Sequence, residues 1–134
     1  MKNKQIFIQD CGTYSNEIIV AVDSTKEDIL KFLKKLPRVK KEAIEWLKEE
    51  KQAFIIFEKN NALVAHNDGK LLLLLRKVRN DWDYWEMLLH ETHHITWYIA
   101  ENKMFQQEME AQAYLQEYLF HSIRRKIMGR LASG

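Results

Sequence analysis

The stretch DWDYWEMLLHETHHITWYIAENK, residues 81–103, decides how this chain folds, because its apolar side chains recur at helical spacing. At about 100° per residue, one broad stripe collects Trp82, Trp85, Leu88, Leu89, Thr92, Ile95, Thr96 and Ile99. We expect this stripe to pack on a sheet. His90 and His94 lie almost opposite, on a face where a surface helix would normally carry lysine and glutamate. That second face also carries Asp83, Met87, Trp97 and Tyr98.

A second long helix is predicted after a break near Asn102 and Lys103, and it continues to about residue 126. Asparagine tolerates the left-handed conformation that often ends a helix. Apolar side chains cover most of the surface of this second helix, which predicts that it is largely buried. They are Met109, Leu115, Tyr118, Leu119, Phe120 and Ile123.

Residues 5–51 predict two strands and two helices. Residues 5–9 and 17–22 are the strands, separated by a turn around Gly12. Ser24 and Glu27 resemble a capping box that opens a helix over residues 25–36, and Pro37 ends it. A second helix is expected over residues 39–51.

Three short apolar runs follow, at residues 53–57, 62–65 and 70–78, and we expect each to be a strand. Turns at residues 59–61 and at Asn67-Asp68-Gly69 would close hairpins between them. Residues 71–75 lack periodicity and also fit a helix. The order of the elements predicts one α+β domain over residues 1–134, with a small mixed sheet packed on N-terminal helices and on a C-terminal pair of long helices.

The bulk composition limits the class of protein. A hydrophobic content of 46% and a charged content of 30% are those of a globular chain. Cys11 is the only cysteine, so it has no internal disulfide partner, which favours a reducing compartment. Neither a signal peptide nor a membrane span is recognisable, so we expect a soluble cytoplasmic protein that does not act on membranes.

Basic residues gather between residues 31 and 41, and they have two interpretations. One is a patch for nucleic acid or an acidic partner, and the other is a solvated helix face balanced by nearby glutamates. The net charge of only +2 and the mixed signs favour the solvated face over a nucleic-acid partner. The basic run consists of Lys31, Lys34, Lys35, Arg38, Lys40 and Lys41.

His90-Glu91-Thr92-His93-His94 is the pattern that carries chemistry. Two histidines four residues apart on a helix share a face, so both imidazoles can reach one zinc ion. Glu91 beside them would accept a proton from metal-bound water. His93 could pair with His90 instead, but only His94 leaves Glu91 beside the metal. A chance or purely structural cluster of histidines is the competing interpretation.

A catalytic zinc site needs a third protein ligand and one position left for water. Glu110 in the following helix is the preferred candidate, because a carboxylate in a buried helix needs a partner. Tyr114, one turn further on, would donate its hydroxyl to a developing oxyanion, or it is a core tyrosine. Glu117 and His121 are the alternative ligands, or they orient a ligand, or they lie on a solvated stripe.

These residues resemble the small single-domain zincins of the gluzincin type, including minimal forms and peptidases of phages and mobile elements. The resemblance covers about residues 71–123 and is strongest in the helical pair. It implies a zincin-like fold, zinc ligands His90, His94 and Glu110, and Glu91 as general base. It also implies that an edge strand between residues 53 and 78 holds an extended substrate. A Gly-x-x-His extension after His94 is absent, and the interval to Glu110 is short.

The sequence therefore predicts a zinc metallopeptidase that acts on a peptide or protein substrate, with Glu91 and Tyr114 as catalytic residues. A non-enzymatic regulator or interaction module on the same fold is the alternative. A structural metal site is a third interpretation, in which His93, Glu117 or His121 replaces the water as fourth ligand.

Overall fold

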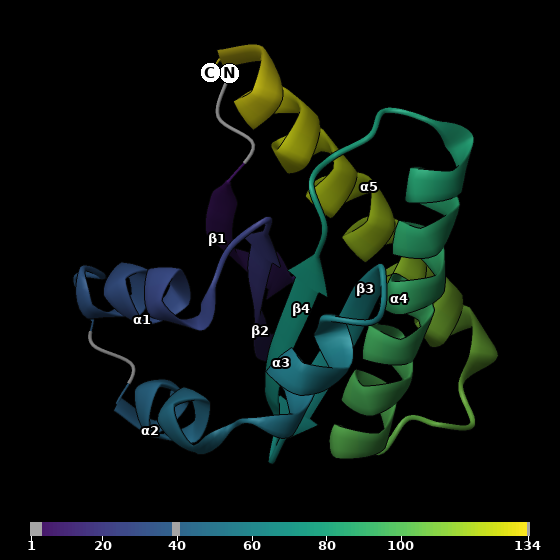
Figure 1. Cartoon of the computed structure of the whole chain (residues 1–134). Coiled ribbons are helices and arrows are strands. Elements are labelled where there is room, and N and C mark those ends of the chain that lie inside the picture. Colours follow the sequence, from purple (N-terminus) through teal and green to yellow (C-terminus); the bar gives the residue numbers. More distant parts are fainter. Residues whose placement is uncertain (1–3, 39–40, 134) are drawn as a thin grey trace.

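A four-stranded mixed sheet lies between two layers of helices (Figure 1). The computed structural model describes residues 4–38 and 41–133. Its elements are β1 (Gln5–Cys11), β2 (Tyr14–Val22), α1 (Lys26–Lys34), α2 (Lys41–Glu49), α3 (Gln52–Phe57), β3 (Ala62–Asn67), β4 (Lys70–Leu75), α4 (Trp82–Asn102) and α5 (Met109–Ser133). The predicted α+β class is confirmed.

The sheet has the order β1-β2-β4-β3, and only the central pair β2 and β4 is parallel. Strand β4 contains five consecutive leucines, Leu71 to Leu75, and all of them are buried. A strand covered by helices on both faces needs apolar residues at every position, which explains the missing periodicity. The alternative that this run is helical is therefore wrong.

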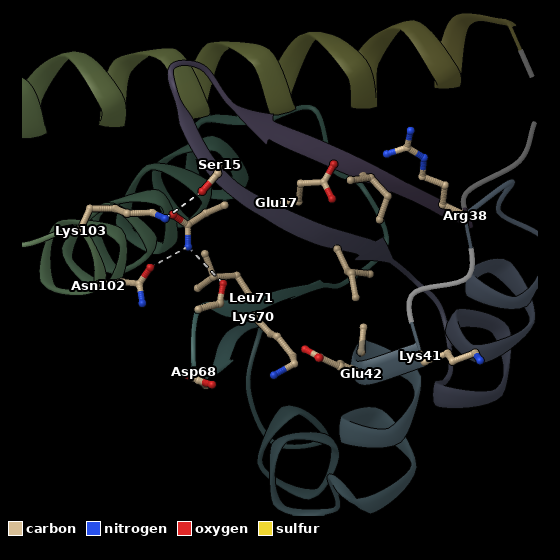
Figure 2. Close-up of a pocket in the computed structure, with 15 residues that line it drawn as sticks. Ser15, Glu17, Arg38, Lys41, Glu42, Asp68, Lys70, Leu71, Asn102 and Lys103 are labelled. Carbon is tan, nitrogen blue, oxygen red and sulfur yellow. Dashed lines mark hydrogen bonds between the residues drawn. The ribbon is translucent and has the colours of Figure 1, made fainter.

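The hairpin predicted at Asn67-Asp68-Gly69 is confirmed as the turn between β3 and β4. Asp68 and Gly69 have positive φ angles of 47° and 83°, the conformation that a two-residue hairpin turn requires. Asp68 and Lys70 also border an open pocket at this end of the sheet (Figure 2). The turn fixes the register of β3, which becomes an edge strand.

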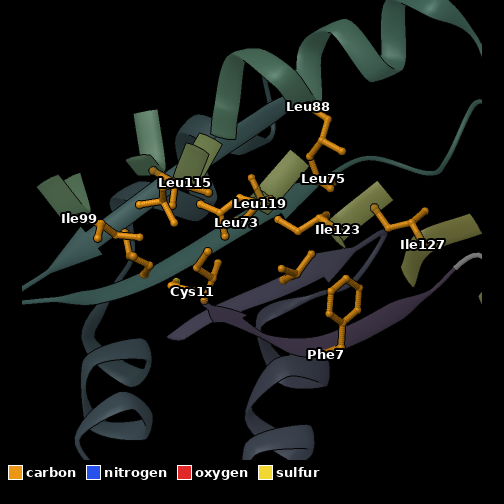
Figure 3. Packing of buried hydrophobic residues seen from close by; sticks show 14 of the residues in the cluster. Phe7, Cys11, Leu73, Leu75, Leu88, Ile99, Leu115, Leu119, Ile123 and Ile127 are labelled. Atoms are coloured by element: carbon orange, nitrogen blue, oxygen red, sulfur yellow. The ribbon is translucent and has the colours of Figure 1, made fainter. Parts of the chain in front are cut away.

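Alternate residues of the inner strands enter two separate cores. Val20, Val22, Leu73 and Leu75 pack with α4 and α5, as Figure 3 shows for the two leucines. Ile19, Ala21, Leu72 and Leu74 pack on the other face with residues of α1, α2 and α3. The sheet therefore holds both helical layers in place by the period-two alternation of its side chains.

Helix α4 begins where Asp81 accepts a hydrogen bond from the backbone N–H of Tyr84, at 2.8 Å. The predicted sheet-facing stripe is confirmed for most members, including Leu88, Ile95 and Ile99, which are fully buried. Trp82 and Leu89 were expected in this stripe but are exposed by 77% and 43%. Both lie at the margin of the stripe, beyond the reach of the sheet.

Helix α5 differs from the prediction of a largely buried helix. Leu115, Leu119, Ile123 and Ile127 form a single buried face, and Met109 is 82% exposed. Helices α4 and α5 share the same face of the sheet, so α5 contacts the sheet along one stripe of its surface only. The break between the two helices is confirmed, although Met104 rather than Asn102 has the positive φ angle, at 62°.

The first helices also depart from the expected boundaries. The N-cap of α1 is Thr25 with Asp28 as its reciprocal partner, not Ser24 with Glu27. Helix α2 ends at Glu49, and the expected start at Val39 lies outside the described residues, as does Lys40 of the basic run. The other five basic residues of that run, Lys31, Lys34, Lys35, Arg38 and Lys41, are exposed.

Residues 53–57 were expected to form a strand, but they lie in the helix α3. Ala53 and Phe57 are buried, and Ile55 and Ile56 are exposed. The buried residues are therefore four positions apart, as on one face of a helix, and not two apart as in a strand. The carboxylate of Glu50 accepts the N–H of Ala53 at 3.2 Å and so supports the first turn. Residues 59–61 therefore connect a helix to a strand and close no hairpin.

Within residues 4–38 and 41–133, no helix is both long enough and apolar enough to cross a membrane.

We predict that Ile123→Ala lowers the free energy of unfolding by about 2–5 kcal/mol, since it removes a fully buried side chain between α5 and the sheet. Urea unfolding followed by circular dichroism measures this loss. Leu89→Ala, at a partly exposed position on α4, is the matched control and is expected to cost less than about 1 kcal/mol. Equal losses for the two variants would contradict the packing of Ile123 between α5 and the sheet.

Candidate functional site

His90 and His94 lie one helical turn apart on the exposed side of α4. Their Nε2 atoms are 3.1 Å apart, and the two rings meet edge to face at 79°. Two zinc ligands with bonds of about 2.0–2.1 Å in a tetrahedron lie roughly 3.3 Å from each other. This contact is within hydrogen-bond distance, and its length is also close to the separation that two ligands of one zinc ion require.

Glu91 is half-buried beside this histidine pair. Burial raises the pKa of its carboxyl group, and the charges of His94 and His90 oppose that rise. A carboxylate with a raised pKa is a stronger base than an ordinary one, so it is better suited to take a proton from water.

Glu110 and Tyr114 do not accompany the histidine pair. Both are exposed, Tyr114 by 69%, and they lie on the face of α5 opposite Leu115 and Leu119. Among the residues that the structure describes, no group of three or more His, Cys, Asp or Glu is placed to hold a metal ion. The expectation that Glu110 is buried is wrong, because α5 buries only its sheet-facing stripe.

The alternative ligands form no metal-holding group with the pair among the described residues, although the ring centroids of His93 and His94 are 6.2 Å apart. His93 points toward α5, where its Nδ1 lies 3.4 Å from the side-chain oxygen of Gln116. Glu117 and His121 line a surface pocket with Tyr114, Tyr118, Arg124 and Arg125, all of them on α5. The structure therefore brings His90, Glu91 and His94 together, and it places none of the other candidate ligands in a metal-holding group with them among the described residues.

Strand β3 lies alongside α4 and has one free edge. The N–H of Arg76 donates to the carbonyl of Asn61, so Asn61 forms a hydrogen-bonded pair with the β4 side. Such pairs alternate along an antiparallel ladder, so the backbone N–H and C=O groups of Ala62, Val64 and His66 point away from β4. In the described part of the chain, these outward groups have no backbone partner. An extended peptide would find a row of unpaired hydrogen-bonding groups there.

His66 is a residue that the sequence did not single out. Its ring stacks on Tyr98 with centroids 3.7 Å apart, and Tyr98 follows His94 by one helical turn. The sequence feature that could have identified His66 is its position two residues after Val64 in β3, because alternate residues of a strand share a face and Ala62 and Val64 pack toward α4. That feature has meaning only once β3 is known to lie beside α4.

We predict that Glu91→Gln raises the melting temperature of the metal-free protein at neutral pH. Burial raises the pKa of Glu91 in the folded state, so the folded protein binds this proton more tightly than the unfolded chain does. The resulting contribution to wild-type stability is fully present below the unfolded-state pKa and is lost as pH rises through the folded-state pKa. Glutamine cannot ionise, so the gain should shrink below about pH 4. Thermal unfolding in a chelator at several pH values measures it. A gain that is independent of pH would contradict the burial of this carboxylate.

Comparison of the chain with models of known families, with curated proteins and with solved structures gives no match.

Proposed function

We propose that this protein is a zinc-dependent peptidase of the zincin type, in which His90 and His94 bind the metal and Glu91 is the general base. The observation that carries the proposal is the 3.1 Å separation of the two Nε2 atoms on the exposed side of α4. The half-buried Glu91 beside them supports the same assignment. The resemblance of residues 90–94 and 110–114 to small gluzincins agrees with it.

The chemistry divides between the metal and the chain. Zinc, when bound, polarises the peptide carbonyl and lowers the pKa of its water. Glu91 would take a proton from the attacking water and deliver it to the leaving amine. The free edge of β3 holds the peptide in extended form next to α4. Strand β3 fits this role because β4 is internal and residues 53–57 are helical.

The proposal requires a third protein ligand. Glu110 is the residue that the resemblance implies, and it lies in the first turn of α5 after a short connection. Glu110 would have to turn toward α4 when metal binds, and Glu117 and His121 are the alternatives.

A second candidate is a non-enzymatic protein that uses the same surface to bind a partner. It is favoured by the absence of a third ligand near His90 and His94 among the described residues. In this case, Glu91→Gln leaves the function of the protein in cells unchanged.

We predict that the wild-type protein retains about one zinc ion per chain after dialysis against metal-free buffer. His94→Ala should lose the ion, because one imidazole of the pair is gone, and Glu110→Ala should lose it if Glu110 is the third ligand. Elemental analysis by mass spectrometry measures the metal content. His93→Ala is the matched control, since His93 faces Gln116 and should keep its zinc.

Absence of zinc from the wild type, or equal zinc in the wild type and His94→Ala, would overturn the metal site. If His94→Ala loses zinc and Glu110→Ala keeps it, the histidine pair still binds the metal and the third ligand is Glu117 or His121.

We predict that Glu91→Gln keeps its zinc and hydrolyses fluorescently labelled casein about 10²–10⁴-fold more slowly than the wild type, because the general base is removed. Glu86→Gln makes the same substitution at an exposed position of α4, where the carboxylate accepts a bond from the indole N–H of Trp82. It should retain wild-type activity. A zinc-loaded wild type without hydrolytic activity would exclude this peptidase assignment in favour of the binding protein.

A further inference from the structure

A small pocket lies where the β3–β4 turn meets the end of α4. Its volume is about 290 Å³, near the lower limit for ligand sites, so it suits a single side chain better than a whole cofactor. His66, Asp68 and Gly69 line it from the hairpin, and Tyr98, Glu101 and Asn102 line it from α4.

The charges of this pocket have one sign. Asp68 and Glu101 contribute two carboxylates, and none of the described residues that line it is lysine or arginine. Helix α4 itself contains no lysine or arginine from Trp82 to Asn102. Lys103, just beyond, donates to the hydroxyl of Ser15 at 2.8 Å. The pocket therefore favours a cationic group.

The larger neighbouring pocket shares Asn16, Asp68, Gly69, Leu71 and Asn102 with the small one, but basic residues also line it (Figure 2). Its lining mixes acids and bases, so its charge selects no ligand. The charged residues that line it are Glu17, Arg38, Lys41, Glu42, Asp68, Lys70 and Lys103.

Asn16, which also lines the small pocket, carries a buried acceptor without a donor among the described residues. The residue is only 8% exposed, and its Nδ2 donates to the carbonyl of Gly69 at 3.1 Å and to Oδ1 of Asn102 at 3.3 Å. Its own Oδ1 is buried and accepts no hydrogen bond from any described residue. Buried acceptors are normally paired, but this oxygen has almost no accessible surface, so an incoming N–H donor reaches it only if the side chains around it move.

The stacked rings of His66 and Tyr98 form an aromatic wall of the pocket. A guanidinium group stacks well on such rings while its N–H groups bond to carboxylates. Arginine therefore matches all three features of the pocket: the two acids, the unpaired amide oxygen and the aromatic wall.

We propose that this pocket binds the cationic side chain of a peptide, preferably arginine, when the peptide adds to the free edge of β3. The inference rests on the proposed function in so far as that function places a peptide along β3. It adds the specificity: a basic residue is positioned at the end of the strand next to Asp68 and Glu101, beyond the histidine pair.

Two matched peptides test this proposal. One is an acetylated and amidated peptide of alternating valine and threonine with a single arginine, and its twin has citrulline, which is neutral, in place of arginine. Both are titrated by NMR into the full-length Glu91→Gln protein, which prevents cleavage. We expect the arginine peptide to bind at least about fivefold more tightly, the ratio of a partly exposed ion pair. The largest shifts should lie at Gly69, Tyr98 and Glu101.

Substitutions in the pocket should remove the preference. Asp68→Asn and Glu101→Gln, made singly and together, are expected to bring the two peptides toward equal affinity. Asn is also compatible with the positive φ angle at position 68. Asp83→Asn, which removes one charge at the other end of α4, is the control and should preserve the preference.

The outcomes separate this proposal from the peptidase. Equal affinity of the arginine and citrulline peptides would contradict the proposed arginine site, even if zinc binds and casein is cleaved. A preference for arginine that survives the double substitution would contradict it as well. A preference for arginine in a protein that binds no zinc would support the arginine site and contradict the assignment as a zinc peptidase. If neither peptide binds, N-acetylarginine amide is titrated alone, and the absence of shifts at Gly69 and Glu101 overturns the pocket.

Discussion

The pairing of β2 with β4 in the middle of the sheet is the constraint on which the rest of the structure depends. Five successive leucines of β4 are buried, three facing α4 and α5 and two facing α1 to α3. A strand of this kind is stable only when helices cover both of its faces. That requirement places a helical layer on each side, and it leaves β1 and β3 as the edges.

The candidate site follows from this arrangement. Helix α4 has to bury Leu88, Ile95 and Ile99 against the sheet, so its opposite side, with His90 and His94, faces outward. The two-residue turn at Asp68 and Gly69 returns the chain as β3, which therefore lies beside α4 with one edge free. One packing requirement thus exposes a pair of imidazoles on α4 and places a strand with one free edge beside that helix.

Helix α5 shows why a wheel projection gave the wrong position for Glu110. Its apolar residues include Met109 and Tyr118 as well as Leu115 and Ile123, and on a helical wheel they cover most of the helix surface. A helix in an outer layer contacts the sheet along one stripe only. Met109 and Tyr118 therefore remain exposed, and so does Glu110.

The sequence by itself determined the local features: the α+β order, the hairpin at Asp68-Gly69, the course of α4 and the adjacency of His90, Glu91 and His94. Each depends on residues within a few positions of one another, because turn chemistry and helical periodicity are local. Tertiary structure alone decided that residues 53–57 are helical, that Glu110 faces solvent, and that His66, Asp68, Glu101 and Asn16 meet in one pocket. These outcomes depend on which surfaces the sheet covers, and contacts between residues far apart in the chain leave no periodic signal in the sequence.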